Sequence, residues 1–335
     1  MKRRTSQHDP NLIVTVESRR PLLYSEGPSA ALDRPAHVRA GSGLAWLPID
    51  GVPRLVVAQD DTNFLAVVDP NTGRVDSIQL DHAVEGRRQF DAGRGNKAHK
   101  LDLEAACVVH HAGRDRVVVF GSGSSPARQR VVVVEPRGPS ARLVDATPLY
   151  AALRACHAFS GSELNVEGAT ALGSSILLAQ RGNGQPRGGL DAVDATCEWP
   201  LVAALEWLDA PGPQAPPISG VVQWDLGSID GLRLTFTDLS AREDGVVGYL
   251  AAAEASPNAI DDGVVLGTAW GWFDESEARW ALIRNPDGTP LLDKAEGFVW
   301  SAGGSGRGFA VLDSDDPERA SELLELSFEG LPGRG

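Results

Sequence analysis

Residues 101–106 read Leu-Asp-Leu-Glu-Ala-Ala, and residues 164–169 repeat the pattern as Leu-Asn-Val-Glu-Gly-Ala. Related phrases are Phe-Thr-Asp-Leu-Ser at 236–240, Lys-Ala-Glu-Gly-Phe at 294–298 and a weaker Gly-Ser-Gly-Leu-Ala-Trp at 41–46. Aligning one polar residue from each phrase gives steps of 62, 63, 71 and 58 residues between Ser42, Glu104, Glu167, Asp238 and Glu296. Regular spacing of this kind indicates a fold built from similar units.

Each phrase is followed by further short apolar segments that end in polar or small residues. The second segments are residues 55–60, 117–122, 176–181, 249–254 and 308–313. The third segments are 64–69, 131–135, 203–207, 269–274 and 323–328, and a fourth place is filled by 74–80, 141–146, 220–226 and 279–284. Short runs rich in valine, leucine, isoleucine and aromatics are typical of β-strands. Their near-continuous apolarity predicts sheets that are covered on both faces.

The pattern predicts an all-β fold, a β-propeller of five blades with four antiparallel strands each. The fifth unit ends three strands in, at Phe328, while the N-terminal segment 11–17 belongs to no unit. We expect this N-terminal strand to supply the missing outer strand and to close the ring, which would remove the exposed edges. Six blades are the alternative, if residues 21–40 or 209–217 contain strands.

Helix content is predicted to be low, with one helix at 148–156 and a shorter one at 316–321. Because a closed ring has no internal boundary, we expect residues 1–335 to form a single domain. Residues 1–10 are polar and basic, and they are predicted to be a disordered tail.

The chain is acidic, with 45 Asp and Glu residues against 31 Lys and Arg residues and a formal net charge of −14. Phosphate backbones repel such a chain, so no nucleic-acid partner is expected. The three cysteines form no CxxC pair, which indicates reduced thiols. The sequence shows no apolar leader and no apolar run that approaches a membrane span. We therefore expect a cytoplasmic protein with a small-molecule substrate or ligand, and its oligomeric state is left open.

In a propeller the first strand of each blade lines the central channel, so equivalent residues converge on one axis. Acids that meet there repel one another unless they are protonated or neutralised. Such a convergence of oxygen atoms suits Ca²⁺, with Mg²⁺ as the alternative, and the adjacent His110 and His111 point to opposite faces and do not support zinc. The predicted metal ligands are Glu104, Glu167, Asp238 and Glu296.

Other polar residues are expected beside this ring. Strand alternation places Asp102, Asn165 and Lys294 on the same face as the acids that follow them. The predicted substrate-binding residues are Asp60, Ser122, Asn183, Glu254 and Lys294. A polar loop at 256–262 would add Asp261 and Asp262 as oxygen ligands if it lies over the channel mouth. No organic cofactor is expected.

A family resemblance is carried by the phrases at 101–106 and 164–169, by Leu-Leu-Ala-Gln-Arg-Gly-Asn-Gly at 177–184 and by Phe-Thr-Asp-Leu at 236–239. Over residues 40–328 the chain resembles bacterial propeller proteins related to the esterase-like phytase and SdiA-regulated groups. This resemblance implies a metal-assisted hydrolase that acts on phosphoester or ester bonds. The chain departs from the family pattern at Ser42, where an acid is frequent, and at Ala105 and Leu239.

The leading hypothesis is a metal-dependent hydrolase of phosphoester, ester or lactone bonds. Its predicted catalytic residues are Glu104 and Glu167, as metal ligands or general base, and Arg181, which would stabilise developing negative charge. A lactonase of the gluconolactonase type would instead place Glu167, Asn183 and Asp238 on one metal ion. The rival hypothesis is a non-catalytic propeller that binds a small molecule or a protein partner, because a fold does not settle a function.

Overall fold

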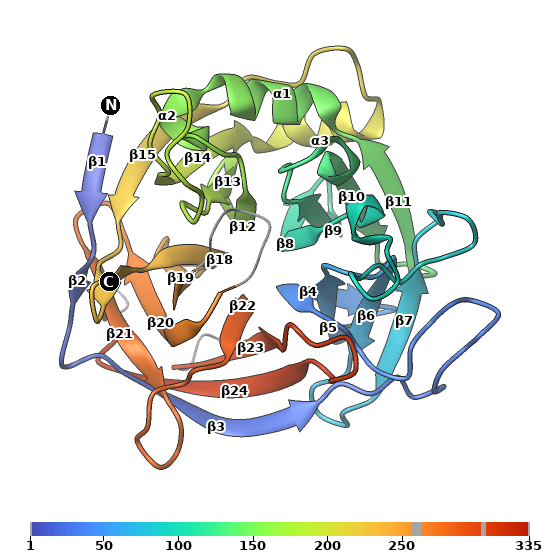
Figure 1. Cartoon of the computed structure of the whole chain (residues 1–335), viewed down its shortest axis with the longest axis horizontal. Helices are drawn as coiled ribbons and strands as arrows, with labels where there is room; N and C mark the ends of the chain where they lie inside the picture. The colour runs from blue at the N-terminus through green and yellow to red at the C-terminus, as the bar shows by residue number, and fades with distance from the viewer. Residues whose placement is uncertain (1, 256–262, 303–305, 334–335) are drawn as a thin grey trace.

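Most of the chain forms short β-strands that surround a central axis (Figure 1). The structure, a computed structural model, describes residues 2–255, 263–302 and 306–333. The predicted polar loop at 256–262, with Asp261 and Asp262, lies outside the described residues. Within the described ranges, no helix combines the length and the apolar character needed to cross a membrane.

The first part of the chain forms two separate four-stranded antiparallel sheets. One contains β4 (Gly41–Ile49), β5 (Val52–Gln59), β6 (Phe64–Val68) and β7 (Val75–Gln79). The next contains β8 (Leu103–His111), β9 (Arg114–Gly121), β10 (Arg130–Glu135) and β11 (Ser140–Asp145). In both sheets the first strand lies nearest the axis and the last strand lies at the rim (Figure 1).

The third sheet continues the pattern and gains one strand from the N-terminus. It contains β12 (Val166–Leu172), β13 (Ser175–Gln180), β14 (Asp194–Pro200) and β15 (Ser219–Asp225), and β1 (Lys2–Thr5) pairs in parallel with β15. Next to it, β16 (Ser228–Ile229) and β17 (Leu232–Arg233) form a small hairpin.

The rest of the chain forms one larger sheet in which two antiparallel runs meet at an N-terminal strand. One run is β18 (Thr235–Ala241), β19 (Val247–Glu254), β20 (Val265–Phe273) and β21 (Ala278–Arg284), and β2 (Gln7–His8) pairs with β21. The other is β22 (Lys294–Trp300), β23 (Arg307–Asp313), β24 (Glu322–Glu329) and β3 (Ile13–Pro21). Strand β3 is antiparallel to β24 along its length and makes a short parallel contact with β21.

The inner strands contact one another in a closed cycle, from β4 to β8, β12, β18, β22 and back to β4. Apolar side chains fill the space between neighbouring sheets, and Phe120, Phe159 and Trp199, for example, share one core cluster. The helices α1 (Thr147–Ala155), α2 (His157–Ser160) and α3 (Leu201–Asp209) lie at the rim (Figure 1). Sheets that radiate from a shared axis define a β-propeller, which is the architecture that the repeat predicts.

Every inner strand has a break in its register at the same place. The residues left without a pairing partner are Ser42, Glu104, Glu167, Thr237 and Glu296. A β-bulge re-aims the side chain of the extra residue and is frequent beside functional sites. The bulge also corrects the sequence alignment, because Thr237 and not Asp238 occupies the repeated position.

One predicted strand, at 203–207, and one predicted helix, at 316–321, are wrong. Residues 203–207 lie in helix α3, and the strand of that sheet is β14. The buried Ala204, Leu205 and Leu208 have helical spacing, so the apolar run covers a helix face. Residues 316–321 form turns rather than a helix, whereas the helix predicted at 148–156 is confirmed as α1.

Residues 2–5 and 7–8 form strands, whereas a disordered tail is predicted for residues 1–10. Strands β1 and β2 extend the rim strands β15 and β21, and Arg4 stacks over Trp224 with its guanidinium carbon 4.9 Å from the ring centre. Backbone pairing and this cation–π contact supply the attachment that the polar composition does not reveal.

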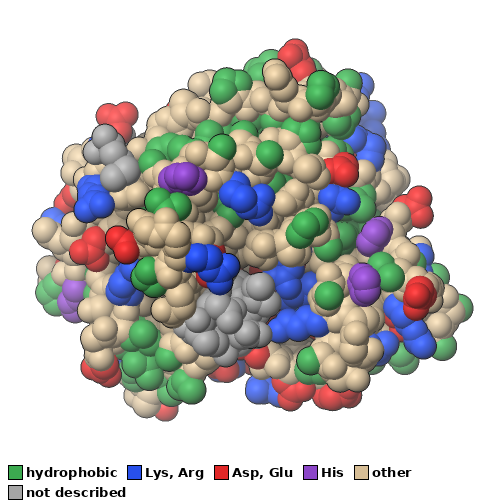
Figure 2. Space-filling model, turned by 45° about the horizontal axis from the view of Figure 1, so that its top comes forward, with side chains coloured by type: hydrophobic (Ala, Val, Ile, Leu, Met, Phe, Trp, Pro, Cys, Tyr) green, Lys and Arg blue, Asp and Glu red, His purple; other side chains and the backbone are tan. Residues whose placement is uncertain are grey.

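On the face drawn in Figure 2, acidic and basic side chains are interspersed.

Candidate functional site

The bulged residues supply two kinds of group to the channel. The hydroxyl of Ser42 donates to the carbonyl oxygen of Leu103, and that of Thr237 donates to Ala295 O at 2.8 Å. Both hydroxyls are therefore used to join one inner strand to the next. The bulged residues that bring carboxylates to the channel are Glu104, Glu167 and Glu296.

One set of charged and polar side chains, here called the Asp102 group, comprises Asp60, Lys100, Asp102, Ser122 and Arg128. Lys100 Nζ lies 2.6 Å from Asp60 Oδ1 and 2.7 Å from Asp102 Oδ1. On its other side Asp102 Oδ2 accepts from the Ser122 hydroxyl and, at 2.7 Å, from Arg128 Nη1. Burial disfavours the charged form of Asp102, but Lys100 and Arg128 outweigh it and lower the pKa of Asp102. Asp102 is therefore an ionised and fully satisfied carboxylate.

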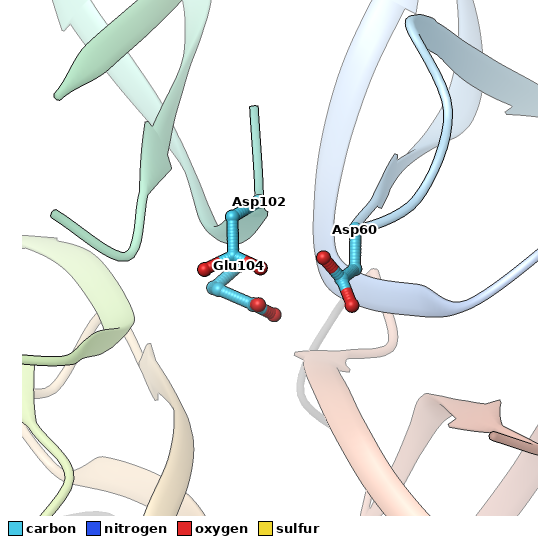
Figure 3. A group of neighbouring side chains, drawn as sticks. All are labelled: Asp60, Asp102 and Glu104. Carbon is cyan, nitrogen blue, oxygen red and sulfur yellow. The ribbon is translucent and has the colours of Figure 1, made fainter. Parts of the chain in front are cut away.

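Glu104 projects toward the Asp102 group (Figure 3), and carboxylate oxygens of Asp60, Asp102 and Glu104 lie within 4.8 Å of one another. Glu104 is only 7% exposed. The described residues give it neither a hydrogen-bond donor nor an ion-pair partner, unlike its neighbours. Burial and the nearby carboxylates raise the pKa of Glu104 well above its ordinary value. Glu104 thus has an unused capacity to hold a proton or a cation.

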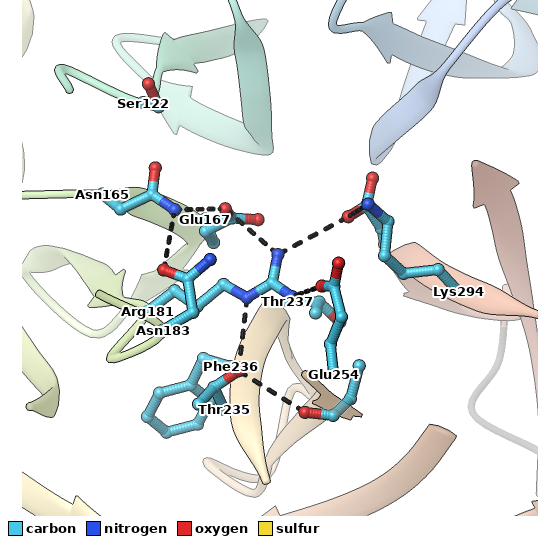
Figure 4. Close-up of polar contacts among 12 residues, drawn as sticks. Ser122, Asn165, Glu167, Arg181, Asn183, Thr235, Phe236, Thr237, Glu254 and Lys294 are labelled. Atoms are coloured by element: carbon cyan, nitrogen blue, oxygen red, sulfur yellow. Dashed lines mark hydrogen bonds and ion pairs between the residues drawn. The ribbon is translucent and has the colours of Figure 1, made fainter. Parts of the chain in front are cut away.

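A second set of charged and polar side chains, here called the Arg181 group, comprises Glu167, Arg181, Thr235, Glu254 and Glu296, and all of them except Glu296 are labelled in Figure 4. The Arg181 guanidinium pairs with Glu254, lies 3.4 Å from Glu167 Oε1 and 3.8 Å from Glu296 Oε1, and its Nε donates to Thr235 Oγ1 at 3.2 Å. Arg181 follows directly on strand β13, which aims it at the axis. One buried cation is therefore shared by three carboxylates from the strands β12, β19 and β22.

The remaining predicted site residues border the Arg181 group. Asn165 Nδ2 donates to Glu167 Oε1 at 2.7 Å and contacts Asn183 Oδ1 at 3.4 Å, and Lys294 Nζ lies 3.3 Å from Glu296 Oε1. Burial is the largest influence on Glu167 and Glu296 and raises the pKa of both, although Arg181 and Lys294 oppose it. The structure thus brings Glu104, Glu167 and Glu296 to one channel, together with Asp60, Ser122, Arg181, Asn183, Glu254 and Lys294.

Comparison with known proteins identifies the family of this chain. Residues 37–328 match the profile of DUF6929, described as a family of unknown function. The chain belongs to the DUF6929 family. A search of curated proteins finds no match. The relation to the esterase-like phytase and SdiA-regulated groups stays a prediction for this DUF6929 member.

The DUF6929 fold is similar to solved structures at low sequence identity. A luciferin-regenerating enzyme shares 9% identity over 89% of this chain and 95% of its own, with a TM-score of 0.44. An α-L-arabinanase of Penicillium chrysogenum shares 8% identity over 93% of this chain and 98% of its own, with a TM-score of 0.46. A gluconolactonase of Xanthomonas campestris shares 14% identity over 95% of this chain and 98% of its own, with a TM-score of 0.39. At these values an activity cannot be transferred, so function has to be argued from this chain's own residues.

Asp238 does not share the surroundings predicted for it as a metal ligand. Its Oδ2 accepts the backbone N–H of Phe298 at 2.7 Å, and burial raises the pKa of Asp238 well above its ordinary value. The side chain is fully buried between inner strands, because the bulge at Thr237 turns the next residue away from the channel. The lactonase ligand set that includes Asp238 is not assembled.

Sequence reasoning missed Lys100 and Arg128. Lys100 and Asp102 both precede strand β8, and the backbone of Asp102 is left-handed with φ 55°, so strand alternation does not predict where the Lys100 side chain lies. Arg128 ends a short 3-10 helix, η2 (Pro126–Arg128), between β9 and β10. Its contact with Asp102 spans 26 residues of sequence, and no local pattern predicts it.

Proposed function

We propose that the channel hydrolyses a small-molecule ester, lactone or phosphoester with the help of a divalent cation, Ca²⁺ or Mg²⁺. The observation that carries the proposal is Glu104, a buried carboxylate at the axis with no partner among the described residues. A buried ionised group needs a counter-charge, and a buried protonated one is a proton donor. Both states are useful in hydrolysis.

The donor set fits a hard divalent cation. Asp60, Asp102 and Glu104 offer oxygen atoms only, and these lie within 4.8 Å of one another. Lys100 already bridges Asp60 and Asp102, so a metal ion there would share or displace the ammonium, and Glu104 is the ligand without a competitor. A bound cation would polarise the scissile group and lower the pKa of a water molecule.

The overall charge of the channel supports the same conclusion. The Asp102 group, Glu104, the Arg181 group and Lys294 together contain six carboxylates and only four cationic side chains. Like charges in a low-dielectric site repel, so either protons or a further cation must compensate them. Ca²⁺ or Mg²⁺ would compensate both excess charges at once.

The chain's own residues would divide the work. Glu104 would hold or release the proton at its carboxylate, as general base when ionised and general acid when protonated. Lys100 and Arg128 fix Asp102 in its ionised form. Arg181 is surrounded by carboxylates and has no evident capacity for an oxyanion, so we assign it to positioning Glu167 and Glu296 rather than to substrate.

Hydrolysis assays on phosphoesters, esters and lactones, with Ca²⁺, Mg²⁺ or EDTA, test the proposal together with calorimetric titration of each metal. We expect Glu104→Gln to reduce metal-stimulated turnover at least about 100-fold and to weaken metal binding, because it removes the unpartnered ligand and base. Glu275→Gln, at an exposed turn, is the matched control. The hydrolase function would be contradicted by no turnover of any phosphoester, ester or lactone, or by turnover in Glu104→Gln equal to that of the wild type.

The saturation of the Arg181 group favours a second candidate, a channel that binds a small molecule without transforming it. In that case metal or ligand binding would be retained while no bond is cleaved. The same titrations and assays separate the two functions, because binding without turnover identifies the non-catalytic channel.

We also infer that the propeller has five blades, that β3 completes the last one and that the chain is one domain. The closed cycle of inner strands and the pairing of β3 with β24 support this inference. We keep the cytoplasmic location and the absence of a nucleic-acid partner as parts of the proposal, since both follow from sequence alone.

A further inference from the structure

A groove of about 470 Å³ opens beside the channel. Its walls come from the loop after β5, from residues 90–97 and from the loop after β23. We call it the acidic groove, because its lining acids outside the Asp102 group are Asp61, Asp91, Asp313, Asp315, Asp316 and Glu318.

Resident cations neutralise only part of this lining. Arg39 bridges Asp61 and Asp91 at 2.5 and 3.1 Å, and Lys294 Nζ lies 3.0 Å from Asp315. Arg94 is occupied by Asp33 and Asp91. Among the described residues, the structure gives no ion-pair partner to the lining acids Asp313, Asp316 and Glu318, and the one lining base in the same condition is Lys97.

Asp313 distinguishes the groove from an ordinary solvated acidic surface. It is 6% exposed, yet it lines the groove. Its Oδ1 accepts the backbone N–H of Asp315 at 2.9 Å, and no described residue donates to its Oδ2. This oxygen is open to the groove and can accept a hydrogen bond or a positive charge from a ligand.

The groove leads to the proposed reaction centre. Asp60 and Lys100 line its inner end and belong to the Asp102 group, whose oxygens lie within 4.8 Å of Glu104. A molecule that extends along the groove from Asp313 therefore reaches the neighbourhood of Glu104. The volume is that of an organic group, and the lining acids without an ion-pair partner among the described residues, Asp313, Asp316 and Glu318, supply negative charge for its cationic end.

We propose that the acidic groove binds the cationic end of the substrate, so that the substrate is a small ester or lactone carrying an ammonium group. This inference rests on the proposed hydrolase function for the ester, but the recognition of the ammonium group stands on the groove alone. Asp313 would contact the ammonium directly, and Asp316 and Glu318 at the exposed edge would attract it over a longer distance.

The decisive measurement compares a choline ester with its neutral isostere, in which a carbon replaces the charged nitrogen. We expect wild-type kcat/KM to favour the choline ester at least about tenfold, because attraction to partly buried carboxylates lowers the barrier only for the cation. The preference should fall toward unity in the triple variant Asp313→Asn, Asp316→Asn, Glu318→Gln. The charge-matched control is Glu206→Gln, Glu275→Gln, Glu329→Gln, whose substitutions lie at exposed positions.

Binding of choline itself, measured by calorimetry, separates this inference from the hydrolase. If neither ester is cleaved, but choline binds and its affinity is about tenfold lower in the triple variant, the hydrolase function is contradicted and the ammonium site in the groove is supported. Equal kcat/KM for both esters, together with no choline binding, would contradict the proposal that the groove binds an ammonium group. Displacement of choline by Ca²⁺ in Glu104→Gln also overturns it, since the groove would then be a metal site. Should the triple variant not fold, Asp316→Asn with Glu318→Gln, at exposed positions, gives the same readout with a smaller expected loss.

Discussion

Single residues in the channel differ chiefly in what neutralises them. Asp102 has Lys100, Arg128 and the Ser122 hydroxyl, and Glu254 has Arg181, whereas Glu104 has none of these. Ion pairs of this kind fix the geometry of a site, and a ligand that binds to their members has to share or displace the paired cation. The position left open for a proton or a cation is therefore Glu104.

Arg181 provides a test of whether the ion-paired residues of the channel have a structural role. Arg181→Met keeps much of the side-chain length and leaves Glu167, Glu254 and Glu296 without their shared cation, so we expect the free energy of unfolding to fall by about 3–5 kcal/mol in urea titrations. Arg187→Met is the control, because that side chain is 73% exposed and its pair with Glu163 contributes about 1 kcal/mol at most. Equal losses in the two variants would show that the Arg181 group is not a buried network.

Asp313 gives a pH dependence of stability. Burial is the largest cause that raises its pKa to about 7, with Asp315 and Asp61 adding to the shift and Lys294 opposing it. A carboxyl with a raised pKa in the folded state favours folding while protonated, so its contribution is lost as the pH rises from 3.8 toward about 7. We therefore expect Asp313→Asn to be less sensitive to pH than the wild type over this window, and more stable than the wild type above it. Parallel thermal-denaturation curves would contradict the shift.

Much of the channel can be predicted at this scale, because propeller geometry carries equivalent residues to one axis. Glu104, Glu167 and Glu296 were found from their repeat positions alone. Asp238 was misplaced by one residue, since a bulge changes which side chain faces the channel and leaves no mark in composition. Arg128 was missed because its contact depends on how a loop returns to the strand.

At the scale of strands and helices, alternation and helical spacing compete in short apolar runs. Residues 203–207 read as a strand, yet the buried positions of α3 continue to Leu208 with a spacing of three and four residues. The residues before it, Asp194–Pro200, form the strand instead and include the buried Trp199. A window of nine residues would have indicated the helix, whereas a window of five does not.

The bulge is the element-scale device that builds the site. It occurs in every inner strand, but only three of its five positions carry glutamate, and Ser42 and Thr237 use their hydroxyls on the neighbouring strand. The backbone distortion thus serves the ring as a whole. Chemistry is a property of the particular side chains placed on it, which explains why the propeller architecture alone predicts no substrate.

For the whole molecule, the inferred ring closure depends on joining the two ends of the chain. Strand β3 contributes Val14 and Val16 to the same core cluster as Leu324, Leu326 and Phe328 of β24. It also covers the edge of β24, which would otherwise present unpaired N–H and C=O groups to solvent. From this inferred closure we expect the channel geometry to depend on the pairing of β3 with β24.

A chain that starts at residue 22 tests this closure. We expect it to lose most of its cooperative thermal transition and to aggregate, because β24 loses its antiparallel partner and the apolar side chains of β3. A chain that starts at residue 10 loses only β1 and β2, which extend the rim, and should keep the transition with a modestly lower Tm. A peptide of residues 10–21 added to the shorter chain should restore folding, whereas the same peptide with Val14→Asp and Val16→Asp should not. If the shorter chain unfolds with the same free energy as the full chain, β3 does not close the ring, and the channel geometry must be held by the inner strands alone.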